Sequence, residues 1–268
     1  MVEGSMSVSI FDIFKVEIDP FGSPAVGLMI GARHLNVPRV DEHPMPYSFR
    51  SAGELLRMCK ASGRTIADLM LENEKCWRST YDIRAGILAI AAAMEACIAR
   101  GCPSGGSFPG PIQVRRPTAE RDRQLSKRLD SAILHAMALN REKARDGRIA
   151  AAPPNGAGGI IAEVLQYYRK FVAGANEDGV VDFLLTAAAI GIIGRENASI
   201  FGSEAGSQAE VEVACAMAAA GLAAVLGGSN EQIENAIDTG LNRHPGISCY
   251  LAGEHGRRPG RDGAFSAA

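Results

Sequence analysis

The sequence predicts a mainly helical protein, on the grounds of composition and of apolar spacing. Hydrophobic residues make up 47% of the 268 residues and include many alanines, whereas aromatic residues make up 6% and Trp occurs once. Because alanine favours helices while aromatic and β-branched residues favour strands, this composition argues strongly against an all-β fold. From residue 51 onward, apolar residues recur at the three- and four-residue spacing of amphipathic helices.

The chain is long enough for one large domain with a substantial core. We divide it into an N-terminal segment of residues 1–40, a single helical domain of residues 41–260 and a disordered tail of residues 261–268. Within the first segment, the apolar run at residues 10–18 predicts a helical turn followed by a strand, before prolines and glycines interrupt the pattern. We expect this segment to be a poorly packed appendage.

Two capping signals open the helical region. Ser51 is followed three residues later by Glu54, which is the spacing of a capping box, and Thr65 with Asp68 repeats it less perfectly. An amphipathic helix is predicted at residues 83–100.

The second half of the chain adds further helices. A charged, solvated connection at residues 115–127 leads into a helix at residues 133–139. Four more helices are predicted, the last with Ser229 as its N-cap: residues 160–172, 181–193, 210–226 and 231–241. Because the helices at 181–193 and 210–226 lack a polar face, we expect them at the centre of the domain.

Charge and targeting signals narrow the function classes. The 28 Lys and Arg nearly balance the 30 Asp and Glu, so binding of nucleic acid by phosphate neutralisation is not expected. The longest apolar stretches are shorter than the ~20 residues of a membrane span, and residues 1–9 lack the apolar run of a secretory leader. We therefore expect a cytoplasmic protein without membrane association, whose six cysteines, free of CxxC pairs, are mostly buried thiols.

A glycine-rich turn at residues 152–159 leads into the helix predicted at 160–172. A helix start preceded by small residues presents free amides and a positive dipole end, which suits an anion such as a carboxylate. The turn is not a P-loop, and Ile161 stands where a dinucleotide fingerprint needs its third glycine. A purely structural turn is the alternative.

Two further turns are rich in polar groups. Residues 196–208 place Asn, Ser, Gln and Glu between two apolar helices, which predicts either a polar cavity or an exposed loop. Residues 243–249 contain His244 and Cys249, which could form a nucleophile pair, although a buried, unreactive thiol is the commoner case.

Motifs within and around these turns occur in a characteristic order along the chain. They are Tyr47-Ser48-Phe49-Arg50-Ser51-Ala52, Met94-Glu95-Ala96-Cys97-Ile98-Ala99-Arg100-Gly101, Pro109-Gly110-Pro111, Gly147-Arg148-Ile149, Ala152-Pro153-Pro154-Asn155-Gly156-Ala157, Glu196-Asn197-Ala198-Ser199-Ile200 and Cys215-Ala216-Met217-Ala218-Ala219-Ala220-Gly221-Leu222-Ala223. Together they resemble the iron-sulfur-dependent L-serine dehydratases, or L-serine ammonia-lyases.

The resemblance implies a fold and a reaction. In that family an all-helical catalytic domain follows a smaller α/β domain, of which residues 1–40 would be a remnant. One open iron of a [4Fe-4S] cluster acts as a Lewis acid on the serine hydroxyl while a base removes the α-proton, and the products are pyruvate and ammonia.

The resemblance also locates the cluster ligands. Their equivalents are Ser207, Cys249 and a position at or near Gly260, so Cys249 is the sole retained thiol. In addition, Pro24 replaces a histidine of the family's active site. Because one thiolate cannot hold a four-iron cluster, we expect no cluster in this chain and no serine dehydration by the family mechanism.

We expect the three turns to converge on one pocket, as they do in the resembling family. Acid-base chemistry there is assigned to Glu204, Ser207 and His244. Substrate binding is assigned to Asn155, Gly156, Ala157, Gly158, Asn197, Ser199 and Ser203.

Three functions remain open at this point. The chain could be an ammonia-lyase that takes missing ligands from a partner chain. It could be a cluster-free enzyme acting on another small amino or carboxylic acid, or a non-catalytic helical remnant or partner subunit. A homo-oligomer or an assembly with a paralogous chain is expected in each case, because truncation of the parent fold would expose apolar helix surface.

Overall fold

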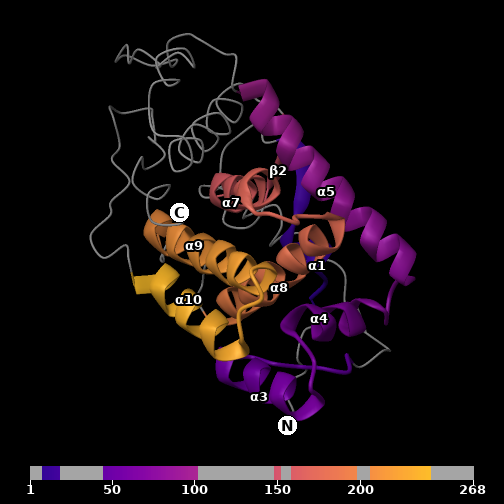
Figure 1. The fold of residues 1–268 in the computed structure, drawn as a ribbon, viewed down its shortest axis with the longest axis vertical. Coiled ribbons are helices and arrows are strands. Elements are labelled where there is room, and N and C mark those ends of the chain that lie inside the picture. Colours follow the sequence, from indigo (N-terminus) through magenta and orange to yellow (C-terminus); the bar gives the residue numbers. More distant parts are fainter. Residues whose placement is uncertain (1–7, 19–44, 102–147, 152–157, 198–205, 243–268) are drawn as a thin grey trace.

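A computed structural model describes residues 8–18, 45–101, 148–151, 158–197 and 206–242 of the protein. Most of these residues form helices, and two short strands form a two-stranded sheet (Figure 1). In chain order the elements are α1 (Ile10–Ile13), β1 (Lys15–Ile18), α3 (Ala52–Ser62), α4 (Ile66–Glu74), α5 (Thr80–Gly101), β2 (Arg148–Ala151), α7 (Gly158–Phe171), α8 (Glu177–Asn197), α9 (Gly206–Val225) and α10 (Asn230–Asn242). The prediction of a mainly helical fold is confirmed.

Helices α8 and α9 form the centre of the core, as predicted. Most of their side chains are buried, including Phe183 and Leu184 of α8 and Met217 of α9. Small residues allow the backbones to approach closely, since Gly221 of α9 lies against Phe183, and Gly240 of α10 lies against the backbone of Ala216. Close packing of this kind leaves no room for a larger side chain at either glycine.

The helix starts follow the capping signals with one difference. Thr65 and Asp68 form a complete capping box at α4, and Ser229 caps α10 by accepting a hydrogen bond from Gln232 N at 3.3 Å. Ser51 caps α3, but the Glu54 carboxylate accepts from Arg50 N at 2.8 Å, so the reciprocal half of the predicted box is displaced by one residue.

The N-terminal turn and strand are present as predicted, but their packing is not. Ile10, Ile13 and Phe14 are buried in the main core. The expectation of a poorly packed appendage is therefore wrong for residues 8–14, because α1 packs against α8 and Ile13 lies beside Gly191.

A buried carboxylate holds this N-terminal turn in place. Glu74, at the end of α4, is fully buried and accepts hydrogen bonds from Ile10 N at 2.6 Å and from the Ser9 hydroxyl at 2.9 Å. Arg78 lies 3.3 Å from the same carboxylate and stacks over the Phe11 ring. Burial raises the pKa of Glu74, and these hydrogen bonds and the Arg78 charge oppose part of that rise.

Strand β1 pairs antiparallel with β2, with Lys15 opposite Ala151 and Ile18 opposite Arg148. The pairing joins the N-terminal segment to the middle of the chain. Strand β2 was not predicted, because four residues of sequence Arg-Ile-Ala-Ala carry no strand alternation.

Several predicted features lie outside the described residues: the connection at 115–127, the helix at 133–139 and the tail at 261–268. Within the described ranges, no helix is both long and apolar enough to cross a membrane.

The contact between α9 and α10 can be tested with Gly240→Ala. The added Cβ would lie 2.8 Å from the Ala216 backbone, so we expect the free energy of unfolding to fall by about 1–3 kcal/mol. The matched control is Gly53→Ala in α3, where a Cβ meets nothing within 4 Å. Chemical denaturation should find this control unchanged or up to about 1 kcal/mol more stable. Equal effects of both variants would contradict the packing argument.

The role of Glu74 can be tested with Glu74→Ala, compared with Glu72→Ala on the same helix. Loss of Glu74 leaves the Ser9 hydroxyl, Ile10 N–H and Arg78 without their shared acceptor, so we expect destabilisation of about 3 kcal/mol or more. Glu72 makes surface ion pairs whose loss should cost about 1 kcal/mol or less. Hydrogen exchange at residues 9–14 should accelerate in the first variant alone. Protection of those amides in Glu74→Ala would show that the carboxylate does not hold the turn.

Candidate functional site

The helix contacts fix which ends of the core lie together. Gly221 of α9 meets Phe183 near the start of α8, and Met217 meets Gly191 further along α8, so the two helices run antiparallel. The end of α8 and the start of α9 therefore lie at one end of the pair. Helix α10 returns along α9, with Gly240 against Ala216, so α10 ends toward that same end of the core (Figure 1).

Helix α7 begins toward the same end. Glu163 of α7 lies within electrostatic reach of Cys215, in the middle of α9, and α7 packs against α9. Further along α7, the Tyr168 hydroxyl lies over Gly179 near the start of α8. Because the start of α8 adjoins the end of α9, α7 runs in the direction of α9, and its first residue, Gly158, lies toward the start of α9.

The structure thus describes the helix ends that border all three predicted turns. Gly158 is the first residue of α7, Asn197 the last of α8 and Ser207 the second of α9. The other predicted site residues lie outside the described ranges: Asn155, Gly156, Ala157, Ser199, Ser203, Glu204, His244 and Cys249. The convergence of their side chains, and the proximity of Ser207 to Cys249, remain predictions.

An acidic residue missed by the sequence analysis lies inside the core. Glu163, on the second turn of α7, is 1% exposed, and among the described residues neither carboxyl oxygen has a hydrogen-bond partner. Burial raises its pKa to about 9, so the group is a neutral acid near pH 7. The signal in the sequence was a lone glutamate within the apolar run Ile160-Ile161-Ala162-Glu163-Val164-Leu165.

Three of the four described thiols are core residues, and the fourth, Cys76, is half-buried. Burial, and then the carboxyls of Glu163 and Glu212, raise the pKa of Cys215 to about 12. Burial likewise raises the pKa of Cys59 to about 11. Cys97 is also buried, and the prediction of mostly buried thiols is confirmed for these three. Thiols that stay protonated are poor metal ligands, and the described part of the chain contains no cluster of three or more ligand-type residues.

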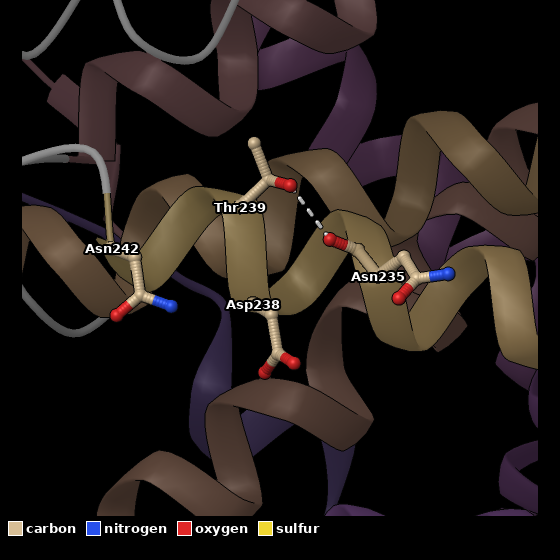
Figure 2. Close-up of a pocket in the computed structure, with 4 residues that line it drawn as sticks. All are labelled: Asn235, Asp238, Thr239 and Asn242. Carbon is tan, nitrogen blue, oxygen red and sulfur yellow. Dashed lines mark hydrogen bonds between the residues drawn. The ribbon is translucent and has the colours of Figure 1, made fainter.

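Two surface hollows were not predicted. Figure 2 shows the first, on the exposed face of α10, where the Thr239 hydroxyl donates to the Asn235 backbone oxygen at 2.8 Å. It is lined by Asn235, Asp238, Thr239 and Asn242. The second adjoins the start of α3 and is lined by Ser48, Arg50, Glu54, Arg57, Met58 and Ala61. Both are open surface features, and Glu163 lines neither of them.

A family model and several curated relatives all match this chain to the serine dehydratases. Residues 61–253 match the family described as serine dehydratase alpha chain. The chain is 49% identical over 221 residues to an L-serine dehydratase of Streptomyces coelicolor, covering 80% of this chain and 49% of that relative. It is 40% identical over 233 residues to L-serine dehydratase TdcG of Escherichia coli, covering 83% and 51%. The chain spans about half the length of the curated relatives it matches.

The protonation of Glu163 predicts a specific pH dependence of stability. Its pKa in the folded state is about 9, against an ordinary value of 4.5, so the folded protein retains a proton that the unfolded chain releases in this window. The stability linked to this group is complete below about pH 4.5 and is lost as the pH rises toward 9. Between pH 5 and pH 8 the loss should be about 2–4 kcal/mol.

The measurement is denaturant unfolding of wild type and Glu163→Gln at several pH values. Because glutamine does not titrate, the stability of the variant relative to wild type should grow with pH. Glu234→Gln, at a half-buried position on α10, should follow the wild-type curve. Parallel curves for wild type and Glu163→Gln would show that the carboxyl is not held neutral.

Proposed function

This chain belongs to the serine dehydratase alpha-chain family, and on that premise we propose that it binds a small amino or carboxylic acid without an iron-sulfur cluster. The observation that carries the proposal is the placement of four helix ends toward one end of the core. They are the starts of α7 and α9 and the ends of α8 and α10, and each borders one of the three turns at residues 152–159, 196–208 and 243–249.

The start of α7 suits the binding of an anionic group of the ligand. The helix is 14 residues long and has no acidic residue in its first turn, whereas its last turn carries Arg169 and Lys170. The free first-turn amides and the helix dipole favour a carboxylate at Gly158. We assign carboxylate binding to Asn155, Gly156, Ala157 and Gly158.

The remaining roles follow from the turns that adjoin this end. We assign contacts with the rest of the ligand to Asn197, Ser199 and Ser203. Proton transfer at the ligand is assigned to Glu204, Ser207 and His244. These are the groups whose amides, hydroxyls and titratable side chains suit a small polar molecule.

The residues at the family's cluster positions do not fit a cluster. A four-iron cluster is held by several cysteine thiolates. Of the three equivalent positions, Ser207 offers a hydroxyl, Gly260 has no side chain, and Cys249 alone offers a thiol. No step through the cluster is therefore assigned to this chain.

A second candidate function is that of a partner subunit. It is favoured by the family's three ligand positions, at which Cys249 alone offers a thiol, so that another chain would have to supply the missing ligands. In this reading the chain pairs with another copy or with a paralogous chain. Two results together would distinguish this function from ligand binding. The chain would form a stable complex with its partner, and alone it would bind no small acid.

The binding proposal can be tested with Gly158→Asp. A carboxylate at the start of α7 should repel the ligand carboxylate and weaken binding of L-serine or 3-hydroxypropionate about tenfold, as measured by calorimetry. The same charge stabilises a helix start, so the folded state should not be weakened. Gly53→Asp, the equivalent change near the start of α3, should leave binding unchanged.

The cofactor is tested separately by iron and sulfide analysis of anaerobically purified protein. The proposal expects far less than one cluster per chain, alone or after reconstitution. A stoichiometric cluster together with pyruvate formation from L-serine would overturn it. Failure of wild type to bind any small amino or carboxylic acid would leave the partner-subunit reading in its place.

A further inference from the structure

Glu163 occupies a position at which an acid is costly. Its neighbours along α7 are buried apolar side chains, among them Ile160, Ile161 and Val164. A buried polar group without a hydrogen-bond partner lowers stability, and native cores seldom retain one. Glu74 shows the ordinary arrangement in this same protein, because its carboxylate accepts hydrogen bonds from Ser9 and Ile10. An acid kept at such a cost points to a partner that arrives with a ligand.

The position of Glu163 along α7 relates it to the start of that helix. Glu163 lies five residues after Gly158, which corresponds to a rise of about 7.5 Å. Side chains on an α-helix lean toward its N-terminus, so the Glu163 carboxyl is directed back along the first turn. The acid and the first-turn amides are therefore within the span of one small molecule.

We propose that Glu163 receives the ammonium group of a small α-amino acid whose carboxylate lies at the start of α7. This inference rests on the proposed binding function and narrows its ligand to zwitterionic amino acids over simple carboxylic acids. The ammonium supplies the charged hydrogen-bond donor that the carboxyl otherwise lacks. A lone carboxylate also suits a monovalent organic cation better than a metal ion, since the described residues contain no group of three metal-ligating side chains.

The surroundings favour a cation. On α9, the Cys215 thiol lies within electrostatic reach of Glu163, and Glu212 lies within reach of that same thiol. On the α5 side, Glu95 is paired with Arg169 at the surface, 2.7 Å apart. Burial, and then the charges of Asp68 and Asp178, raise the pKa of Asp182 on α8, while Arg84 lowers it, so Asp182 belongs to a different cluster. The Glu163 carboxyl therefore has acidic and neutral neighbours, which favour the ammonium end of the ligand beside it, while the ligand carboxylate lies at the start of α7.

Ligand binding must then change the protonation of the protein. Without ligand, burial raises the pKa of Glu163 to about 9, so the group carries its proton at pH 7. When an ammonium arrives, the carboxyl O–H bond breaks, the proton passes to the buffer and an ammonium–carboxylate pair remains. Binding of one amino acid should therefore release up to one proton at pH 7, and affinity should rise as the pH increases toward 9.

The experiment is calorimetric titration of the full chain at pH 7 in two buffers of different ionisation enthalpy. The ligands are L-serine, L-alanine and 3-hydroxypropionate, which lacks the ammonium group. We expect release of close to one proton with the two amino acids and none with 3-hydroxypropionate. Glu163→Gln should weaken L-serine binding about tenfold or more, abolish proton release and leave binding of 3-hydroxypropionate unchanged. Glu234→Gln should behave as wild type.

The outcomes separate this inference from the binding proposal. If L-serine and 3-hydroxypropionate bind equally, without proton release and without sensitivity to Glu163→Gln, the inference is wrong while the binding proposal stands. If neither ligand binds, both fail. Should Glu163→Gln fold poorly, proton release by the wild type decides the question without the variant.

Discussion

Close approach of α8, α9 and α10 is the constraint on which the rest of the structure depends. Glycines and alanines replace larger side chains at the helix contacts, as at Gly221 against Phe183 and at Gly240 against Ala216. Because these contacts fix antiparallel directions, they also decide which helix ends lie together. A bulkier residue at either glycine would separate the helices and displace the turns that their ends support. Packing in the core thus determines the position of the candidate site.

Two buried glutamates show opposite uses of the same side chain. The carboxylate of Glu74 is surrounded by donors from α1 and by Arg78, and it fastens the N-terminal turn to α4. Glu163 has no such donors among the described residues, although it is equally enclosed. The first arrangement is complete within the folded chain. In the second, the carboxyl gains a hydrogen-bond donor only when a ligand brings one. The unpaired acid makes the core less stable, and the need for a donor makes the site more selective.

Sequence reasoning predicted what depends on local spacing. Apolar periodicity located α5, α7 and α10, and long apolar runs without a polar face located α8 and α9. Short-range signals identified Ser229 and Thr65 as helix caps. It failed where a partner lies far away in sequence. The burial of Ile10 depends on Glu74, 64 residues later, and β2 exists because β1 pairs with it. The family resemblance named site residues from motif order alone, but it could not reveal Glu163, whose significance lies in its surroundings and not in a motif.

The pairing of β1 with β2 has a consequence for biosynthesis. Residues 10–18 are synthesised well before their partners, which are β2 and the part of α8 near Gly191. Until then Ile10, Ile13 and Phe14 have no completed core to enter, although the Glu74 acceptor is already available. Contacts so distant in sequence form slowly, and exposed apolar segments invite aggregation in the interval. Residues 10–14 are therefore exposed to aggregation until β2 and α8 have been made, and they reach their final place late in folding.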